Sequence, residues 1–179
     1  MNRLIFSGFG GQGLLTLGEI VATICMKKGK HVTWMPSYGP EMRGGTANCA
    51  VIVSDRLIGS PIVLSHIDTL FAMNQASVDR FVPKMNPGGL VLMNSSLVVN
   101  KPTRADIRLV EIDATNIAVG IGSIRVANMA MLAGLIKNSD LVTLDDVKSV
   151  LEEKFKGARS AQLIPLNLKA IEESIKSLK

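Results

Sequence analysis

The sequence contains few cysteines and few aromatic residues, and these shortages exclude several kinds of site. Its only cysteines are Cys25 and Cys49, too few and too far apart for a CxxC metal knuckle or a four-thiolate iron–sulfur site. We therefore expect both to be buried small hydrophobic residues in a reducing cytoplasm. Aromatic residues make up 4% of the chain, so the core must be built mainly from Ile, Leu, Val, Ala and Met.

The chain also lacks the patterns that target a membrane or a nucleic acid. No apolar run approaches the roughly 20 residues that cross a bilayer, and no signal peptide is evident before the first predicted strand. The net charge is +5, but no basic cluster is interleaved with aromatic residues. We therefore expect no membrane partner and no nucleic-acid partner, and a cytoplasmic location.

What the sequence does contain is an alternation of strand-like and helix-like segments, which predicts an α/β fold. We expect one domain over residues 1–179, built as a three-layer α/β/α sandwich. Its sheet should be largely parallel, with a mixed sheet as the alternative, and its first βαβ unit should be Rossmann-like. Strands are predicted at 2–7, 31–35, 48–54, 69–74, 90–94 and 107–112. Residues 55–61 are predicted to form a turn and a short strand, for which an antiparallel direction is left open. Helices are predicted at 11–28, 76–85, 114–137 with a break at 120–122, 143–155 and 160–178.

The stretch GFGGQG follows the first predicted strand, and Gly8, Gly10 and Gly13 match G-x-G-x-x-G. Such glycines permit a tight turn and let a phosphate approach the start of a helix. The alternative is that they only allow close packing of helix and strand. The motif also contains Gly11 and Gln12, and the Gln12 amide suits either a ligand or cross-chain contact or simple capping of the helix.

An NAD site needs more than this motif, and the rest of it is missing. A Rossmann site places Asp or Glu at the end of the second strand to bind the ribose hydroxyls. Here that strand ends in WMPSY (34–38), and the first acid after it is Glu41. No arginine stands at the strand end for a 2′-phosphate either, so the sequence disfavours NAD and NADP.

The second loop, SYGPEMRGGTAN (37–48), is more specific than the first. Arg43 suits a phosphate or carboxylate, and Glu41 suits a cation or a backbone donor. Gly44 and Gly45 would let another chain or a ligand approach the backbone, and Tyr38 supplies an aromatic ring. The alternative is that Glu41 and Arg43 pair within the fold and hold the loop rigid.

Together, GFGGQG and PSYGPEMRGGTANC resemble the gamma subunit of 2-oxoacid:ferredoxin oxidoreductases. The resemblance continues through IGSPIV (58–63), LFAMNQ (70–75), NPGG (86–89) and ANMAMLAG (127–134), so it covers most of the chain. The second loop is more similar to the 2-oxoglutarate or branched-chain enzymes than to the pyruvate enzymes.

The resemblance implies oxidative decarboxylation of a 2-oxoacid, with coenzyme A capturing the acyl group and ferredoxin accepting the electrons. It places thiamine diphosphate and Mg²⁺ between alpha and beta subunits, and 4Fe-4S clusters in beta or delta. In this chain we expect no catalytic residue and no metal ligand, and His31 and His66 are expected to be structural. The isolated chain should be inactive, with a homodimer left open as its oligomeric state.

The same resemblance suggests that both loops contact coenzyme A or a neighbouring subunit. The expected contacts are Gly8, Gly10, Gly11, Gln12, Gly13, Tyr38, Glu41, Arg43, Gly44 and Gly45. The alternative function is a free-standing nucleotide-binding α/β oxidoreductase that uses Gly8–Gly13 for phosphates. The helix at 123–134 has two possible roles, packing in the core and contact with another subunit. Asn128 in this helix needs a hydrogen-bond partner if it is buried.

These residues predict that the purified chain binds neither NAD nor NADP, because the strand-end acid and arginine are missing. Isothermal titration calorimetry with each dinucleotide should show no binding. A dissociation constant in the low micromolar range for either one would contradict this interpretation of the glycine motif.

Overall fold

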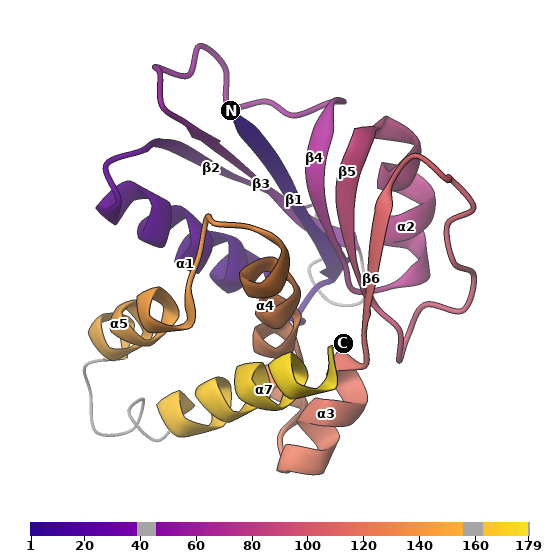
Figure 1. Cartoon of the computed structure of the whole chain (residues 1–179), viewed down its shortest axis with the longest axis vertical. Helices are drawn as coiled ribbons and strands as arrows, with labels where there is room; N and C mark the ends of the chain where they lie inside the picture. The colour runs from indigo at the N-terminus through magenta and orange to yellow at the C-terminus, as the bar shows by residue number, and fades with distance from the viewer. Residues whose placement is uncertain (39–45, 156–162, 179) are drawn as a thin grey trace.

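The computed structural model describes residues 1–38, 46–155 and 163–178 (Figure 1). The strands are β1 (Asn2–Phe9), β2 (His31–Tyr38), β3 (Thr46–Ser54), β4 (Ile67–Ala72), β5 (Met85–Asn94) and β6 (Arg108–Ile112). The α-helices are α1 (Leu14–Lys27), α2 (Gln75–Phe81), α3 (Ala114–Ile121), α4 (Ala127–Asn138), α5 (Leu144–Lys154) and α7 (Leu163–Ser177). Two short 3-10 helices, η1 (Val82–Lys84) and η2 (Ile124–Val126), precede β5 and α4. Among the described helices, none has the length and apolarity needed to cross a bilayer.

The strands form one six-stranded mixed sheet in the order β2-β3-β1-β4-β5-β6. The pairs β1·β4, β4·β5 and β5·β6 are parallel, whereas β3 runs antiparallel to both β1 and β2. This confirms the predicted α/β class with a mixed sheet. β1 and β2 point the same way but are not neighbours, because β3 lies between them.

The short strand left open at 55–61 does not form, since these residues carry no strand assignment. Both edges of β3 are already paired, one with β1 and the other with β2. Asp55, Gly59 and Pro61 also suit a loop better than a ladder. The antiparallel element of this fold is therefore β3 itself.

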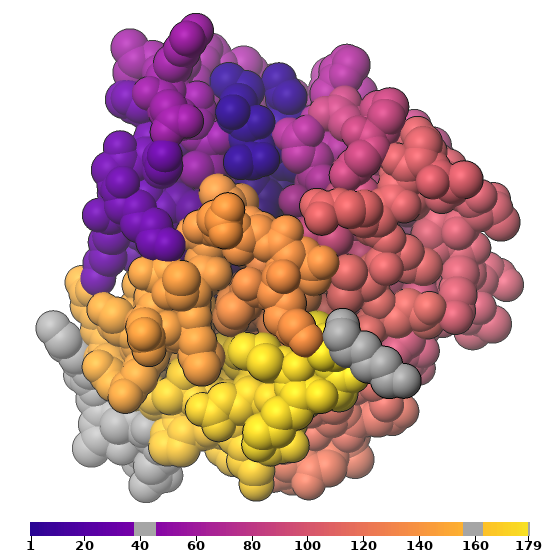
Figure 2. Space-filling view, viewed as in Figure 1, coloured from indigo at the N-terminus to yellow at the C-terminus, as the bar shows by residue number. Residues whose placement is uncertain are grey.

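Helices cover the two faces of the sheet unequally (Figure 1). Buried residues of β1 such as Leu4 and Phe6 share a core with α1, α3, α4, α5 and α7. Ile5, on the opposite face of the same strand, belongs to a smaller core with α2 and η1. The space-filling view shows the orange and yellow segments of α5 and α7 over the face that carries the larger core (Figure 2). Successive side chains of β1 point to opposite faces of the sheet, so this one strand contributes residues to two separate cores.

The first helix packs very close to the sheet, and Gly18 makes this possible. A Cβ atom on Gly18 would lie 2.4 Å from Cys49 Sγ and 3.3 Å from Phe6 Cδ2. Cys25 and Cys49 are both free and buried, as the sequence predicted. Burial raises the pKa of Cys25 to about 11 and that of Cys49 to about 12, so both stay protonated thiols at neutral pH.

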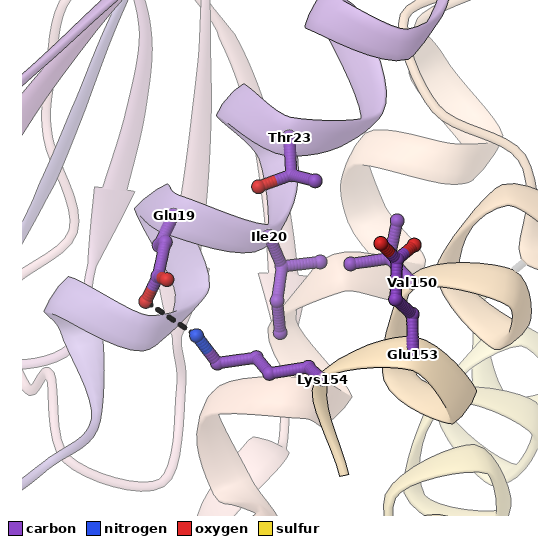
Figure 3. Close-up of a pocket in the computed structure, with 6 residues that line it drawn as sticks. All are labelled: Glu19, Ile20, Thr23, Val150, Glu153 and Lys154. Carbon is purple, nitrogen blue, oxygen red and sulfur yellow. Dashed lines mark ion pairs between the residues drawn. The ribbon is translucent and has the colours of Figure 1, made fainter. Parts of the chain in front are cut away.

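Ion pairs join α1 to α5 on this face. Lys154 Nζ lies 2.6 Å from a carboxylate oxygen of Glu19 (Figure 3), beside a cavity of about 170 Å³. Lys27, which lies closer to the end of α1 than Glu19, pairs with Glu153 of α5. The charged groups of this cavity already pair across the two helices, so it is better explained as a helix junction than as a ligand site.

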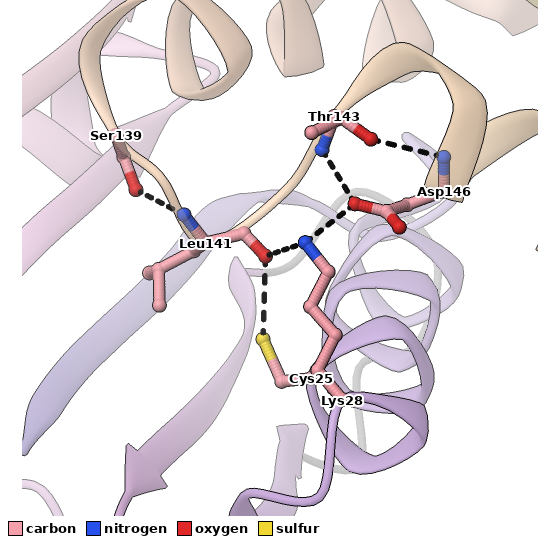
Figure 4. Close-up of polar contacts among 6 residues, drawn as sticks. All are labelled: Cys25, Lys28, Ser139, Leu141, Thr143 and Asp146. Atoms are coloured by element: carbon pink, nitrogen blue, oxygen red, sulfur yellow. Dashed lines mark hydrogen bonds and ion pairs between the residues drawn. The ribbon is translucent and has the colours of Figure 1, made fainter.

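A second junction links the carboxyl end of α1 to the start of α5 (Figure 4). Lys28 Nζ lies 2.6 Å from Asp146 Oδ2 and donates to the Leu141 carbonyl oxygen at 3.2 Å. Asp146 also completes a capping box with Thr143 at the first turn of α5. Burial favours the neutral carboxyl, but the hydrogen bonds from Lys28 and Thr143 outweigh it and hold the pKa of Asp146 below its ordinary value.

This junction predicts a pH-dependent loss of stability in the variant Asp146→Asn. A depressed carboxyl pKa stabilises the fold above the unfolded-state value of about 3.9, and the contribution disappears as the pH falls through the lower folded-state pKa. We expect the variant to lose about 1 kcal/mol of unfolding free energy at pH 7 in urea titrations, and less as the pH falls below about 4. Asp145→Asn, in the same helical turn, is the control. Equal losses in the two variants would show that the junction contributes nothing specific.

Candidate functional site

The carboxyl ends of β1 and β4 form the point where the chain changes direction across the sheet. These strands are parallel neighbours, with Leu4 opposite Thr69 and Ser7 opposite Ala72. After β1 the chain crosses through α1 toward β2, whereas after β4 it crosses through α2 toward β5 on the other side. In open α/β sheets, ligands bind in the crevice at such a switch point.

The glycine loop after β1 closes on itself at this point. The Gln12 backbone N–H donates to the Phe9 carbonyl oxygen at 3.2 Å, and the Phe9 N–H donates to Gln12 Oε1 at 2.7 Å. The Gln12 side chain therefore closes the turn, and it does not cap α1, which has no side-chain cap. Gly10 and Gly11 lie in this turn, Gly10 half-buried and Gly11 exposed.

Two of the glycines are required by close contacts. A Cβ on Gly8 would lie 2.3 Å from Gln12 Oε1 and 2.8 Å from Met73 Cβ, a residue that follows β4. Gly13 has a left-handed backbone (φ 74°), and its Cβ would lie 2.4 Å from Asn128 Nδ2. Only glycine fits such positions without displacing a neighbour.

Asn128 ties the glycine loop to α4. It is 6% exposed; its Nδ2 donates to the Gly13 carbonyl oxygen at 3.0 Å, and its Oδ1 accepts from the Met129 N–H at 2.9 Å. The partner that a buried asparagine needs is therefore the glycine loop, 115 residues earlier in the chain. ANMAMLAG is also largely core, since Ala127 to Leu135 are buried.

A cavity of about 240 Å³ opens beside this loop. Its wall is mainly apolar, and among the described residues that line it the single cationic one is Arg125, in η2 just before α4. Arg125 is exposed and has no ion pair with any carboxylate of the described residues. The residues that line the cavity are Gly11, Gln12, Met73, Leu97, Thr115, Ile124, Arg125 and Ala127.

Two buried asparagines stand at the same edge of the sheet with polar atoms left unpaired. Asn74, 3% exposed, caps α2 through Oδ1, and no partner for its Nδ2 is found in the described chain. Asn94, fully buried, donates from Nδ2 to Thr115 Oγ1 at 2.9 Å, and its own Oδ1 has no described partner. Each unpaired buried polar atom costs about 1–3 kcal/mol. Core packing alone does not account for this polarity.

The second loop leaves the sheet at the same edge. Gly8 lies opposite Ala47 of β3, and Ala47 lies opposite Tyr38, the last residue of β2. The loop between Tyr38 and Thr46 therefore starts two strands away from Gly8. Glu41, Arg43, Gly44 and Gly45 lie outside the described residues, so the contacts expected of them stay predictions.

Sequence reasoning missed the part of this site that comes from the second half of the chain. Arg125, Thr115 and Leu97 reach the cavity from three separate segments, and none of them lies in a recognisable motif. The only local signal for Arg125 is its place between a helix break and the start of the next helix. His66, by contrast, lies at the opposite edge before β4, with Nδ1 3.2 Å from Asn86 Oδ1. In the described part of the chain, no three His, Cys, Asp or Glu residues are grouped as a metal site would require.

Comparison with known proteins shows the family of the chain. The family model described as pyruvate ferredoxin/flavodoxin oxidoreductase matches residues 3–177. The chain is 36% identical over 170 residues to ketoisovalerate oxidoreductase subunit VorA of Methanothermobacter thermautotrophicus, covering 95% of this chain and 35% of that one. It thus spans about a third of that relative. It is 33% identical to 2-oxoglutarate synthase subunit KorC of Methanocaldococcus jannaschii, covering 91% of this chain and 89% of that one.

Solved structures agree with the fold. The gamma subunit of keto/oxoacid ferredoxin oxidoreductase from Geobacter sulfurreducens superposes with a TM-score of 0.80 at 28% identity, covering 98% of this chain and 97% of that one. A 2-oxoglutarate:ferredoxin oxidoreductase from Magnetococcus marinus, solved with 2-oxoglutarate, coenzyme A and succinyl-CoA bound, shares the fold at a TM-score of 0.85 and 23% identity, over 31% of its length. On the family match across nearly its whole length, the chain belongs to the pyruvate ferredoxin/flavodoxin oxidoreductase family.

Proposed function

We propose that this chain is the gamma subunit of a 2-oxoacid:ferredoxin oxidoreductase. The complex would convert a 2-oxoacid and coenzyme A into acyl-CoA and CO2, passing two electrons to ferredoxin. The observation that carries this proposal is end-to-end similarity to separate subunits: KorC over 89% of its length and the Geobacter gamma subunit over 97%. The second loop favours a 2-oxoglutarate or branched-chain substrate.

The redox cofactors belong on partner chains in this proposal. Metal clusters are held by thiolates, whereas Cys25 and Cys49 are buried thiols whose pKa values burial raises to about 11 and about 12. The donor set of this chain therefore does not fit an iron–sulfur cluster. Thiamine diphosphate, Mg²⁺ and the 4Fe-4S clusters are assigned to the alpha, beta and delta subunits, and this chain shapes the assembly.

The carboxyl edge of the sheet is the part of this chain best suited to coenzyme A. The α1 N-terminus carries no side-chain cap, so its first N–H groups and the helix dipole favour an anion. Arg125 adds a guanidinium at the adjacent cavity, and Arg43 belongs to the loop that leaves the same edge. These groups suit the phosphates of coenzyme A, while the apolar cavity wall suits an aliphatic chain.

A second role for the same edge is to seal the contact with the alpha subunit, with Arg43 paired to a carboxylate. Exposed apolar side chains favour this role, since Leu97 and Ile124, which line the cavity, are 42% and 63% exposed, and Phe9 at the end of β1 is 43% exposed. Exposed apolar groups of this size commonly mark protein contacts. The two roles make different kinetic predictions.

The free-standing nucleotide-binding enzyme is supported less well. In a Rossmann site the strand after the first helix lies beside the first strand and brings its terminal acid to the ribose. Here β3 occupies that place and runs the other way, with Phe9 opposite Thr46 at the carboxyl end of β1. No described acid stands at this ribose position.

The ligand role predicts a selective defect in the assembled complex for Arg125→Ala and for Arg43→Ala. Losing a charged hydrogen bond of about 1.5–3 kcal/mol should raise the apparent KM for coenzyme A roughly ten- to a hundredfold. The KM for the 2-oxoacid should stay nearly unchanged. Steady-state kinetics with each substrate varied in turn measures both constants.

The matched control is Arg108→Ala, an exposed arginine at the start of β6 on the opposite edge of the sheet. It should leave both constants at their wild-type values. If the Arg43 and Arg125 variants keep wild-type coenzyme A kinetics, or if their complexes fall apart, the edge is an interface and not a coenzyme A contact.

The subunit assignment predicts that the isolated chain has no activity. With thiamine diphosphate and Mg²⁺ added, it should neither decarboxylate 2-oxoacids nor reduce a viologen dye, because it lacks ligands for the redox cofactors. Activity should appear when alpha and beta partners are added, measured as 2-oxoacid-dependent viologen reduction. Turnover by this chain alone would overturn the proposed function.

A further inference from the structure

The smaller face of the sheet carries an apolar surface that the proposed coenzyme A contact does not use. Among the described helices only α2 and η1 share a core with this face. Beside them runs the loop between β3 and β4, residues 55–66, which contains IGSPIV and has no helix or strand. Three of its aliphatic side chains face solvent: Leu57 is 83%, Ile62 55% and Leu64 76% exposed.

A groove of about 230 Å³ lies between this loop and α2. Its floor includes Ile5 and Ala50 of the sheet, and its sides include Leu64 of the loop and Phe81 of α2. Met35 of β2, 40% exposed, extends the apolar lining across the sheet. Ser37 of β2 and Asn48 of β3 also line the groove, so the loop and the sheet form a depression that is apolar along the loop and around Phe81 and polar at these two positions.

The rim of the groove is cationic. Arg80 and Lys84 both line it, and both lie over the Phe81 ring, at 5.0 Å and 5.9 Å from its centroid. Both are exposed, and within the described residues neither pairs with a carboxylate. A groove with aliphatic and aromatic walls and cations at its rim complements a segment that carries aliphatic side chains and at least one carboxylate.

We propose that this groove docks an acidic, aliphatic segment of a partner subunit of the oxidoreductase. The inference rests on the proposed function, because it needs a complex. In the VorA relative the matching region is about a third of a longer chain, so the remaining two thirds are held to it covalently. The KorC relative instead matches over 89% of its own length, and a separate subunit of that kind must hold corresponding partners through its surface.

A second copy of this chain suits the groove less well than an acidic partner. In a two-fold dimer the same patch meets itself, so Arg80 and Lys84 of one copy would face the same cations of the other. The chain as a whole carries a net charge of +5, which adds to the repulsion.

The proposal is tested in the complex formed by co-expressing this chain with its alpha and beta partners. The first variant is the charge reversal Arg80→Glu with Lys84→Glu, and the second is Leu64→Asp. Each should weaken binding of this chain to its partners at least tenfold, measured by biolayer interferometry with the partners immobilised. The charge-reversal defect should shrink as salt rises, whereas the Leu64→Asp defect should persist.

The control is Met26→Asp, which adds the same charge at an aliphatic side chain that is 61% exposed near the end of α1. It should bind like the wild type. Circular dichroism and urea titration of each isolated variant should match the wild type, because none of the replaced side chains is buried. A photo-crosslinking residue at position 64 should then link to a partner peptide that contains acidic residues.

Wild-type binding by both groove variants, or cross-links that join only two copies of this chain, would overturn the proposal. In either case the complex would still oxidise 2-oxoacids, so the proposed function would stand. If the wild-type chain does not assemble with these partners at all, the proposed function fails and this inference fails with it.

Discussion

The close contact between the glycine loop and its neighbours is the constraint on which the candidate site depends. Gly8 has no room for a side chain because Met73, at the end of the neighbouring strand β4, lies against it. Gly13 is held in a left-handed conformation against Asn128 of α4. Three segments that are far apart in the sequence, the glycine loop, the end of β4 and the start of α4, therefore meet at one edge of the sheet. The cavity lies where they meet, so a shift of any one of them changes its shape.

Much of the fold could be predicted because hydrophobic spacing reports directly on which residues face a core. Helix ends with a local chemical cause were also predictable: Gly122 ends α3 with a φ of 93°, and Gly29 follows α1 with a φ of 75°. The helix predicted over 76–85 is shorter in the structure, since α2 stops at Phe81 and the chain continues as the short 3-10 helix η1, which contains Pro83. Strand direction was not predictable, because a period of two is the same whichever way a strand runs.

The candidate site likewise has one part that a local sequence motif predicts and one part that only the fold brings together. Gly8 and Gly13 belong to a local motif whose physical requirement, a tight turn with no side chain, is visible in the sequence. Arg125 and Thr115 reach the cavity only because β4, β5 and β6 line up in parallel and bring the segments after them to one edge. No local pattern encodes that meeting. Gln12 illustrates a smaller limit: its amide oxygen closes its own turn, which the sequence did not predict, while the residue also lines the cavity.

The inserted strand β3 explains how a dinucleotide-like motif can serve another purpose. The turn, the helix dipole and the uncapped N-terminus of α1 are local properties, and they favour an anion whatever lies next to β1. Recognition of a ribose instead depends on the neighbouring strand, and here that strand runs antiparallel and starts, rather than ends, at this edge. The edge therefore keeps the local geometry of the phosphate-binding turn of a Rossmann site, whereas the neighbouring strand that would carry the ribose-binding acid runs the other way. Where a Rossmann site would bind the ribose, this chain has Arg125, an apolar cavity and the start of a second polar loop. These features suit a phosphorylated ligand presented by a neighbouring subunit.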